Sequence, residues 1–241
     1  MENPYESDRL VNEYLLFHYG ADDEVLPWGF GPREALRFAA RTVAETFAPP
    51  AAGRALDLGC AVGRSAFELS KTCDAVVGID FSHAFIAAAQ RLKDTGRHEY
   101  ERHEEAARFA PAVAEVPAGA RPERVAFEQG DAMDLRGDLG QFDAVHAANL
   151  LCRLPEPARF LARLPDLVRP GGRLVLTTPC TWLEEFTPRQ NWPRGATLDF
   201  LQDHLAASFA LDRTQEMPFL IREHARKFQW TVAQASVWTR R

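Results

Sequence analysis

Residues 55–65 read Ala-Leu-Asp-Leu-Gly-Cys-Ala-Val-Gly-Arg-Ser, a short apolar strand that leads into a turn and then into the start of a helix. Gly59 and Gly63 bracket the turn, and the lack of a side chain at both positions lets a ligand approach the backbone. The N–H groups that open the following helix point toward such a ligand. The stretch therefore predicts a nucleotide-cofactor loop at the end of a buried strand.

A second apolar run, 75–79, ends at Asp80. Its distance from the loop is close to the ~20 residues at which an acidic side chain reaches ribose hydroxyls in a βαβ unit. A dinucleotide loop needs G-x-G-x-x-G, but Ala61 occupies the place of the second glycine, so a pyrophosphate ligand is disfavoured. The chain also lacks G-x-x-x-x-G-K-[ST], which disfavours a nucleoside triphosphate with its magnesium.

The sequence Asp57-x-Gly59 after one strand, with Asp80 at the end of the next, resembles the cofactor loop of class I S-adenosylmethionine methyltransferases. S-adenosylmethionine has an amino acid and a ribose but no phosphate, in agreement with the glycine pattern. Glycine turns after strands also serve structure alone, so the loop is weighed together with the rest of the chain.

Composition favours small-molecule chemistry in one domain. With 241 residues, 46% of them hydrophobic, the chain can bury one sizeable core. We expect a single domain over residues 1–241, with N-terminal cap helices in 1–50 and a Rossmann-like core in 51–241. The net charge of -6 offers no basic footprint for nucleic acid or an anionic membrane. No run approaches the ~18 apolar residues of a membrane span and the chain starts without a leader pattern, so a cytoplasmic location is expected.

Strand and helix patterns alternate along the chain, as in a parallel sheet with crossover helices. Helices are expected at 5–18, 33–47, 64–71, 82–94 and 156–168. Strands are expected at 54–58, 75–79, 124–128, 142–148, 173–178, 209–217 and 228–238. The array predicts a doubly wound, Rossmann-like α/β fold with a seven-stranded sheet and an N-terminal helical lid.

Residues 95–123 fit this plan poorly, because they are rich in charge, Ala and Pro where a crossover should be short. We interpret them as an insertion. His98 and His103 lie close to several glutamates, but no pair stands at H-E-x-x-H spacing, and mixed charge runs usually form solvated helix or hairpin faces. The four cysteines lack C-x-x-C spacing and are expected to be reduced thiols, so no metal site is predicted.

Further polar residues follow the strands. Asp131 can accept a hydrogen bond from an adenine amino group and Met133 can cover the ring, although a plain turn explains both equally well. Asn149 falls at the carboxyl edge, where ligands of open sheets bind. The candidate cofactor-binding residues are Gly59, Cys60, Ala61, Gly63, Asp80, Phe81, Asp131, Ala132, Met133 and Asn149.

Several longer motifs narrow the resemblance. Together they are similar to the 4-mercaptohistidine (5-thiohistidine) N-methyltransferases of ovothiol biosynthesis, which occur alone or as the C-terminal domain of a bifunctional enzyme. The likeness spans nearly the whole chain, except that the family pattern has an aromatic residue where Cys180 stands. The motifs are Asn3-Pro-Tyr-Glu6 with 14–20, residues 57–65, Asn149-Leu-Leu-Cys-Arg-Leu-Pro155, Thr181-Trp-Leu-Glu-Glu-Phe-Thr-Pro188, and 217–227.

This resemblance implies methyl transfer from S-adenosylmethionine to an imidazole ring nitrogen of 5-thiohistidine, with S-adenosylhomocysteine as the product. The iron-dependent sulfoxide synthase portion of the bifunctional enzyme has no counterpart here, which implies functional coupling to a separate synthase. Placement of the nucleophile behind the methyl is expected to be the enzyme's main contribution, which can reach ~7–11 kcal/mol of the barrier.

Opposite charges are expected to hold the amino acid end of the substrate, with Arg222 or Arg226 on the carboxylate and Glu184 or Glu185 on the ammonium. The two arginines could equally well belong to a solvated charged turn, and the two glutamates could equally well be acidic residues in the first turn of a helix. Histidine is a residue type that can take up a proton after transfer, so His224 is a catalytic candidate beside Asn149, with an ordinary surface or hydrogen-bonded histidine as the alternative.

Aromatic residues complete the predicted site. Tyr14 and Tyr19 belong to the N-terminal helix and are candidates for closing over the ligands. Trp182 is a candidate wall of the substrate pocket, with core packing against Phe186 as the alternative. Two other functions stay open: a methyltransferase for a different small molecule, and a binding domain that has lost the reaction.

Overall fold

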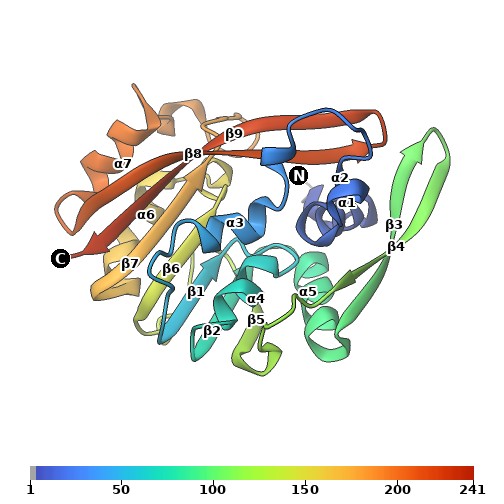
Figure 1. The fold of residues 1–241 in the computed structure, drawn as a ribbon. Coiled ribbons are helices and arrows are strands. Elements are labelled where there is room, and N and C mark those ends of the chain that lie inside the picture. Colours follow the sequence, from blue (N-terminus) through green and yellow to red (C-terminus); the bar gives the residue numbers. More distant parts are fainter. Residues whose placement is uncertain (1–3) are drawn as a thin grey trace.

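The computed structural model describes residues 4–241, so Asn3 of the first motif lies outside the described residues. Its body is a seven-stranded sheet in the order β5-β2-β1-β6-β7-β9-β8 (Figure 1). The strands are β1 (Arg54–Leu58), β2 (Ala75–Asp80), β5 (Val125–Gln129), β6 (Phe142–Ala148), β7 (Val168–Thr178), β8 (Phe209–His224) and β9 (Lys227–Arg240).

The strand order positions a ligand site. β5, β2, β1, β6 and β7 pair in parallel, and the antiparallel β9 and β8 close one edge. The chain winds outward from β1 through β2 to β5 and then returns to place β6 on the other side of β1. Ligands of open α/β sheets bind at such a switch point, outside the carboxyl ends of the strands. The predicted doubly wound, seven-stranded fold is confirmed.

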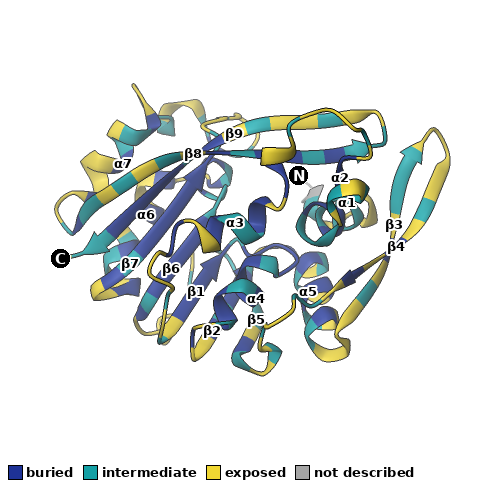
Figure 2. Cartoon of the chain, viewed as in Figure 1, coloured by how far each residue is buried: buried dark blue, intermediate teal, exposed yellow. Residues whose placement is uncertain are grey.

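Helices cover both faces of the sheet. Leu56 and Leu58 of β1 belong to the apolar cluster that includes α6 and α7, whereas Ala55 belongs to the cluster that includes α1, α3, α4 and α5. This split follows from the two-residue period of a strand, and Figure 2 shows the central strands buried between the layers. The helices are α1 (Asp8–Tyr19), α2 (Asp22–Val25), α3 (Phe38–Ala44), α4 (Arg64–Ser70), α5 (His83–Thr95), α6 (Pro157–Leu167) and α7 (Thr197–Leu205).

The predicted insertion forms a separate antiparallel hairpin, β3 (Arg97–Glu105) with β4 (Arg108–Glu115), which projects from the body (Figure 1). One side of the hairpin is buried, with Tyr100, Ala112 and Ala114 in the core cluster that contains α1 and α5. Its other side is largely exposed, which agrees with the prediction of a solvated face for its charge runs.

The structure differs from the prediction at several elements, and β7 begins at Val168, five residues before its expected start. The helix expected at 33–47 is divided into a 3-10 turn (Arg33–Ala35) and α3, because Arg37 adopts a left-handed φ of 58° between them. Helix α7 was not predicted, and β8 continues seven residues past the expected end to His224. Other 3-10 turns are Pro4–Glu6, Pro122–Arg124, Leu151–Arg153 and Arg189–Asn191. None of the helices in residues 4–241 combines the length and apolarity needed to cross a bilayer.

Candidate active site

The loop between β1 and α4 is a tight turn. The N–H groups of Gly59 and Cys60 both donate to the carbonyl of Ile79, and Gly59, Ala61 and Gly63 all have positive φ angles. A Cβ on Gly63 would lie 2.6 Å from the ring of Phe127, so α4 can pack against β5 only because residue 63 has no side chain. The structure thus gives Gly63 a packing role, whereas the sequence suggested ligand approach.

Asp80 is held in place by the loop. Its carboxylate accepts hydrogen bonds from the N–H groups of Ala61 (2.8 Å) and Ser82 (2.9 Å), one on each oxygen. Burial raises the pKa of Asp80 to about 6, the two N–H groups oppose that rise, and the negative charges of Asp57 and Glu6 add to it. Among the described residues no cation forms an ion pair with this carboxylate, so its remaining lone pairs suit neutral hydroxyl donors.

The neighbouring strand ends provide an apolar face and a second carboxylate. Phe81 directly follows β2, and its side chain is 57% exposed. Asp131 follows β5, which pairs with β2, and one of its oxygens accepts a hydrogen bond from the N–H of Met133 (2.8 Å). Ala132 and Met133 are half-buried against the core. A flat ring with an amino group, such as adenine, can stack and hydrogen-bond in this arrangement.

Asn149 lies on the other side of the loop, at the end of β6. It has a φ of 55°, and its N–H donates to the carbonyl of Thr177 (2.8 Å) at the end of β7. Its side-chain oxygen accepts a hydrogen bond from the Thr177 hydroxyl (3.0 Å). Cofactor candidates from four strand ends, those of β1, β2, β5 and β6, therefore lie along one edge of the sheet.

The N-terminal segment covers this edge. The Tyr19 hydroxyl donates to the carbonyl of Val62 (2.8 Å), and the Ser82 hydroxyl donates to the carbonyl of Tyr5 (2.9 Å). The Glu6 carboxylate accepts from the first two N–H groups of α5. The helical lid predicted from the sequence is thus fastened to the loop after β1 and to the start of the helix after β2.

The lid presents uncharged rings. The Tyr14 ring lies 4.7 Å from that of Phe85 and 5.7 Å from that of His18. Burial raises the pKa of Tyr14, so its phenol stays neutral. Burial, together with the charge of Arg64, lowers the pKa of His18 to about 3, so this imidazole is neutral too.

The sequence is similar to several known methyltransferases. Residues 56–174 match the methyltransferase domain family. The O-methyltransferase cnsE of Penicillium expansum is 31% identical over 137 residues, or 56% of this chain and 41% of that protein. A demethylmenaquinone methyltransferase of Clavibacter sepedonicus is 31% identical over 129 residues, or 54% of this chain and 42% of that protein. The chain thus spans well under half the length of these curated relatives.

The N-methyltransferase NodS from Bradyrhizobium japonicum WM9, solved in complex with S-adenosylhomocysteine, has the same fold. Its TM-score to this chain is 0.56 at 16% identity, covering 95% of this chain and 98% of that one. Residues 56–174 thus match a methyltransferase domain, and the chain has the fold of a solved methyltransferase. At 16% identity the solved structure shows the fold alone.

The residues of this methyltransferase domain fit S-adenosylmethionine. The chemistry of the donor set is the test: Asp80 keeps lone pairs for ribose hydroxyls, and the exposed ring of Phe81 and the carboxylate of Asp131 suit adenine. Burial keeps the His18 imidazole neutral, so this lid residue adds no positive charge that would repel a sulfonium. Within residues 4–241 no cluster of three or more His, Cys, Asp or Glu side chains is arranged to hold a metal ion.

The structure corrects the prediction for Arg222. This side chain is 2% exposed, and its guanidinium donates to the carboxylate of Glu104 (2.7 Å) on β3 and to the carbonyls of Glu24 and His103. Desolvation lowers the pKa of Arg222 although Glu104 opposes the shift. Arg222 joins the inserted hairpin to β8, so both of its Nη nitrogens are engaged within the protein.

The remaining residues of the 217–227 motif lie at the same place. The ring of His224 is 5.5 Å from that of His103 on the inserted hairpin, and the guanidinium of Arg226 lies 5.2 Å from the ring of Trp28. Figure 1 shows this tip of the β8–β9 hairpin beside α2 and far from the end of β6. The structure therefore does not bring together the two catalytic candidates, His224 and Asn149.

Residues of the 181–188 motif lie elsewhere, in the loop after β7. Glu184 and Glu185 are exposed, and Glu184 pairs with Arg189 (3.5 Å). The Trp182 indole donates to the Thr197 hydroxyl (3.2 Å) and lines a hollow of about 390 Å³ together with Cys180. Arg222 and Arg226 are thus separated from Glu184 and Glu185, and the charge clamp cannot form from both groups.

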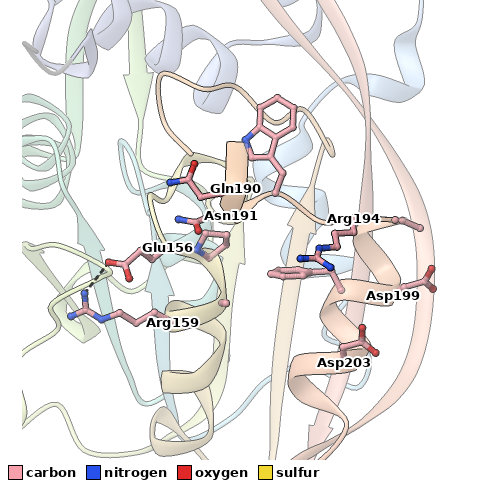
Figure 3. A pocket seen from close by; sticks show the side chains of 13 residues that line it. Glu156, Arg159, Gln190, Asn191, Arg194, Asp199 and Asp203 are labelled. Carbon is pink, nitrogen blue, oxygen red and sulfur yellow. Dashed lines mark hydrogen bonds and ion pairs between the residues drawn. The ribbon is translucent and has the colours of Figure 1, made fainter. Parts of the chain in front are cut away.

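A larger cleft of about 570 Å³ opens beside that hollow, between the start of α6, the 190–196 loop and α7 (Figure 3). Glu156 and Arg159 form an ion pair on one wall (3.3 Å), and Asp199 and Asp203 of α7 lie on the other. Of the predicted substrate residues, Trp182 alone lies next to these openings within the described chain.

Sequence reasoning did not select one residue of this region, Arg153, although it belongs to the quoted 149–155 motif. It ends the 3-10 turn after β6, and its guanidinium donates to the carbonyls of Cys152 (3.2 Å) and Thr181 (3.1 Å). The same group lies 4.9 Å from the ring of Phe186, on which Tyr5 of the N-terminal segment stacks. Only the folded chain brings these three segments together.

Proposed function

We propose that this methyltransferase transfers a methyl group from S-adenosylmethionine to an imidazole ring nitrogen of 5-thiohistidine, with a separate sulfoxide synthase supplying that substrate. The observation that carries the cofactor half is the geometry of Asp80, a carboxylate fixed by two backbone N–H groups at the switch point of the sheet. The substrate half rests on the resemblance of the motifs to thiohistidine N-methyltransferases.

The packing of two motifs supports the substrate half. The 149–155 and 181–188 motifs are separated in sequence, but the Thr187 hydroxyl donates to the carbonyl of Leu154 (2.7 Å) and Arg153 donates to that of Thr181. The two motifs that carry the resemblance thus pack against each other in the loops after β6 and β7. A substrate site in this unit would explain why both segments resemble the same enzymes.

The order of the strand ends sets the direction of the cofactor. Asp131 at the end of β5 would hold the adenine and Asp80 at the end of β2 the ribose, which would leave the amino acid end to the ends of β1 and β6, where Asn149 lies. The acceptor then sits beyond it, toward the ends of β6 and β7. The Trp182 hollow and the 181–188 loop occupy that side.

The cofactor supplies a methyl group made electrophilic by a sulfonium, and the protein must place a ring nitrogen in line behind it. Because the substrate's sulfur is the softer nucleophile, orientation of the ring decides that nitrogen is methylated. The lid, closed by the Tyr19 hydroxyl on Val62, excludes water. A neutral ring nitrogen needs no strong base, and placement of this kind can be worth ~7–11 kcal/mol.

Calorimetric titration tests the proposal in two steps. S-adenosylhomocysteine should bind the purified protein, and 5-thiohistidine should then bind the preformed complex more tightly than histidine does. The Asp80→Ala variant should bind S-adenosylhomocysteine more weakly by about 1.5–3 kcal/mol, because charge-assisted hydrogen bonds are lost. If the protein binds S-adenosylhomocysteine but neither binds nor methylates 5-thiohistidine, the cofactor half of the proposal stands and the substrate half is wrong. The acceptor would then be another small molecule.

A further inference from the structure

We propose that Arg153 binds the anionic group of the methyl acceptor, which for 5-thiohistidine is the α-carboxylate. This inference rests on the proposed function for the identity of the acceptor. It replaces the assignment of the carboxylate to Arg222, whose two Nη nitrogens are engaged by Glu104 and two backbone carbonyls.

The position of Arg153 is the first argument. It is reached four residues after Asn149, at the end of the turn that follows β6, and it is tied to the loop after β7 through the carbonyl of Thr181. The acceptor is expected on this side of the sheet edge. Tyr5 links this guanidinium to Asp80: its ring stacks on Phe186, and its carbonyl accepts a hydrogen bond from the hydroxyl of Ser82, whose N–H donates to Asp80.

The lack of an acidic partner is the second argument. Among the described residues no Asp or Glu forms an ion pair with Arg153, and the groups that act on its charge are Cys152, Tyr5 and Tyr14. Other arginines of the region have such partners: Arg159 pairs with Glu156, and Arg189 pairs with Glu184. The half-buried guanidinium is hydrogen-bonded to neutral groups only, so its positive charge remains available to an anion.

The orientation of the guanidinium is the third argument. One of its nitrogens, Nη1, makes the hydrogen bonds to the carbonyls of Cys152 and Thr181 and contacts the Cys152 sulfur (3.3 Å). The side chain of Tyr5 also hydrogen-bonds to this guanidinium, whose centre lies 4.9 Å from the ring of Phe186. A planar fork that is fixed in this way suits bidentate binding of a carboxylate. Glu184 and Glu185 lie in the same loop as Thr181 and Phe186, so they remain the candidates for the substrate's ammonium.

The test compares 5-thiohistidine with its decarboxylated analogue, 5-thiohistamine, in the wild type and in Arg153→Gln. Removal of the guanidinium should lower kcat/KM for 5-thiohistidine about 10- to 100-fold and leave kcat/KM for the analogue within about threefold. S-adenosylhomocysteine affinity should not change. Arg153→Lys should recover part of the loss, because it restores charge without the fork. Arg163→Gln, which removes an exposed cation of α6 paired with Asp166, is the matched control.

Two results would overturn the assignment. One is an equal loss on both acceptors with unchanged cofactor binding, which indicates a positional effect of Arg153 on the loop. The other is a wild-type protein whose kcat/KM is the same for 5-thiohistidine and 5-thiohistamine. If the wild type methylates neither compound, the proposed function fails. Arg153 is then judged by titrating histidine and histamine into the S-adenosylhomocysteine complex, where preferential, Arg153-dependent binding of histidine supports it and its absence overturns it.

Discussion

Asp80 combines two properties that rarely occur together at a surface: a fixed geometry and a raised pKa. Two backbone N–H groups orient the carboxylate, and burial raises its pKa to about 6. Both properties suit a ligand that donates hydroxyl groups. Hydrogen bonds from the hydroxyl groups of a bound ligand would offset the free-energy cost of burying the Asp80 charge.

Cofactor affinity should therefore depend on pH. The ionised carboxylate accepts two hydroxyl hydrogen bonds, whereas protonation occupies one of its oxygens, so protons compete with the ligand. With a pKa of about 6 in the free protein, S-adenosylhomocysteine affinity should be constant above pH 7 and fall as the pH drops through 6. Calorimetry from pH 5 to 8 measures this, with Asp80→Ala as the control that loses the dependence. An affinity that is flat from pH 5 to 8 in the wild type would remove Asp80 from the binding site.

Gly63 should be intolerant of a side chain for reasons of space. In Gly63→Ala the new Cβ would lie 2.6 Å from the ring of Phe127, in addition to the strain of a φ of 87°. We expect a loss of about 2–4 kcal/mol in the free energy of unfolding, measured with urea. Gly119→Ala is the control, since Gly119 has a φ of 79° and a Cβ added there would meet no atom within 4 Å; it should lose only about 1–2 kcal/mol. Equal losses would mean that packing against Phe127 contributes nothing.

Single residues also mark what the sequence could and could not predict. The positions of Gly59, Gly63, Asp80 and Asn149 at or just after strand ends could be predicted, because each follows from local patterns in the sequence; their binding of a cofactor stays a prediction. Arg153 was missed because its environment comes from three segments that meet only in the fold. Whether a cation lacks a partner cannot be read from its neighbours in sequence.

The inserted hairpin is attached by a buried ionic network. Arg222 of β8 and Arg102 of β3 both pair with Glu104, and Arg102 also pairs with Glu24 of α2. Long charged side chains in this network join elements that are distant in sequence. The charge-rich character of residues 95–123 and 217–227, which suggested substrate binding at the second segment, therefore has a structural cause.

Arg222→Met should destabilise the protein and spare catalysis. Removing the buried Arg222 leaves Glu104 with Arg102 as its remaining cation and should cost about 3 kcal/mol in the free energy of unfolding. The KM for 5-thiohistidine, measured well below the melting temperature of the variant, should stay within twofold of the wild type. Arg108→Met, at an exposed pair with Glu105 on the same hairpin, should change stability by less than about 0.5 kcal/mol. A raised KM with unchanged stability would restore Arg222 to the substrate site.

Elements were predicted well where one periodicity dominated. The parallel strands and helices α4, α5 and α6 lie within a few residues of the predicted ranges, except that β7 begins earlier, because alternating or amphipathic patterns fix them locally. The helix at 33–47 was wrong because the left-handed Arg37 interrupts an otherwise helical pattern. The long β8–β9 pairing was underestimated, since its outer part is half exposed and is stabilised by contacts with the inserted hairpin and α2.

The whole molecule combines a widely shared α/β scaffold with loops after β6 and β7 that are particular to this chain. The scaffold is shared with a solved methyltransferase of low sequence identity, so it shows the fold and not the acceptor. The acceptor must be decided by what lies beyond β6 and β7: Arg153, the 181–188 loop and the aromatic lid. The sequence could predict the scaffold because its pattern is repeated along the chain, whereas the acceptor side is assembled from short, separate segments.

The most direct test of the account is mass spectrometry of the reaction between the purified protein, S-adenosylmethionine with an isotopically labelled methyl group, and 5-thiohistidine, with histidine as the competing acceptor. The account predicts a labelled product heavier than 5-thiohistidine by one methyl, with the label on a ring nitrogen by nuclear magnetic resonance and no product from histidine. A methyl group on sulfur, or no transfer to 5-thiohistidine by a protein that binds S-adenosylhomocysteine, would contradict it.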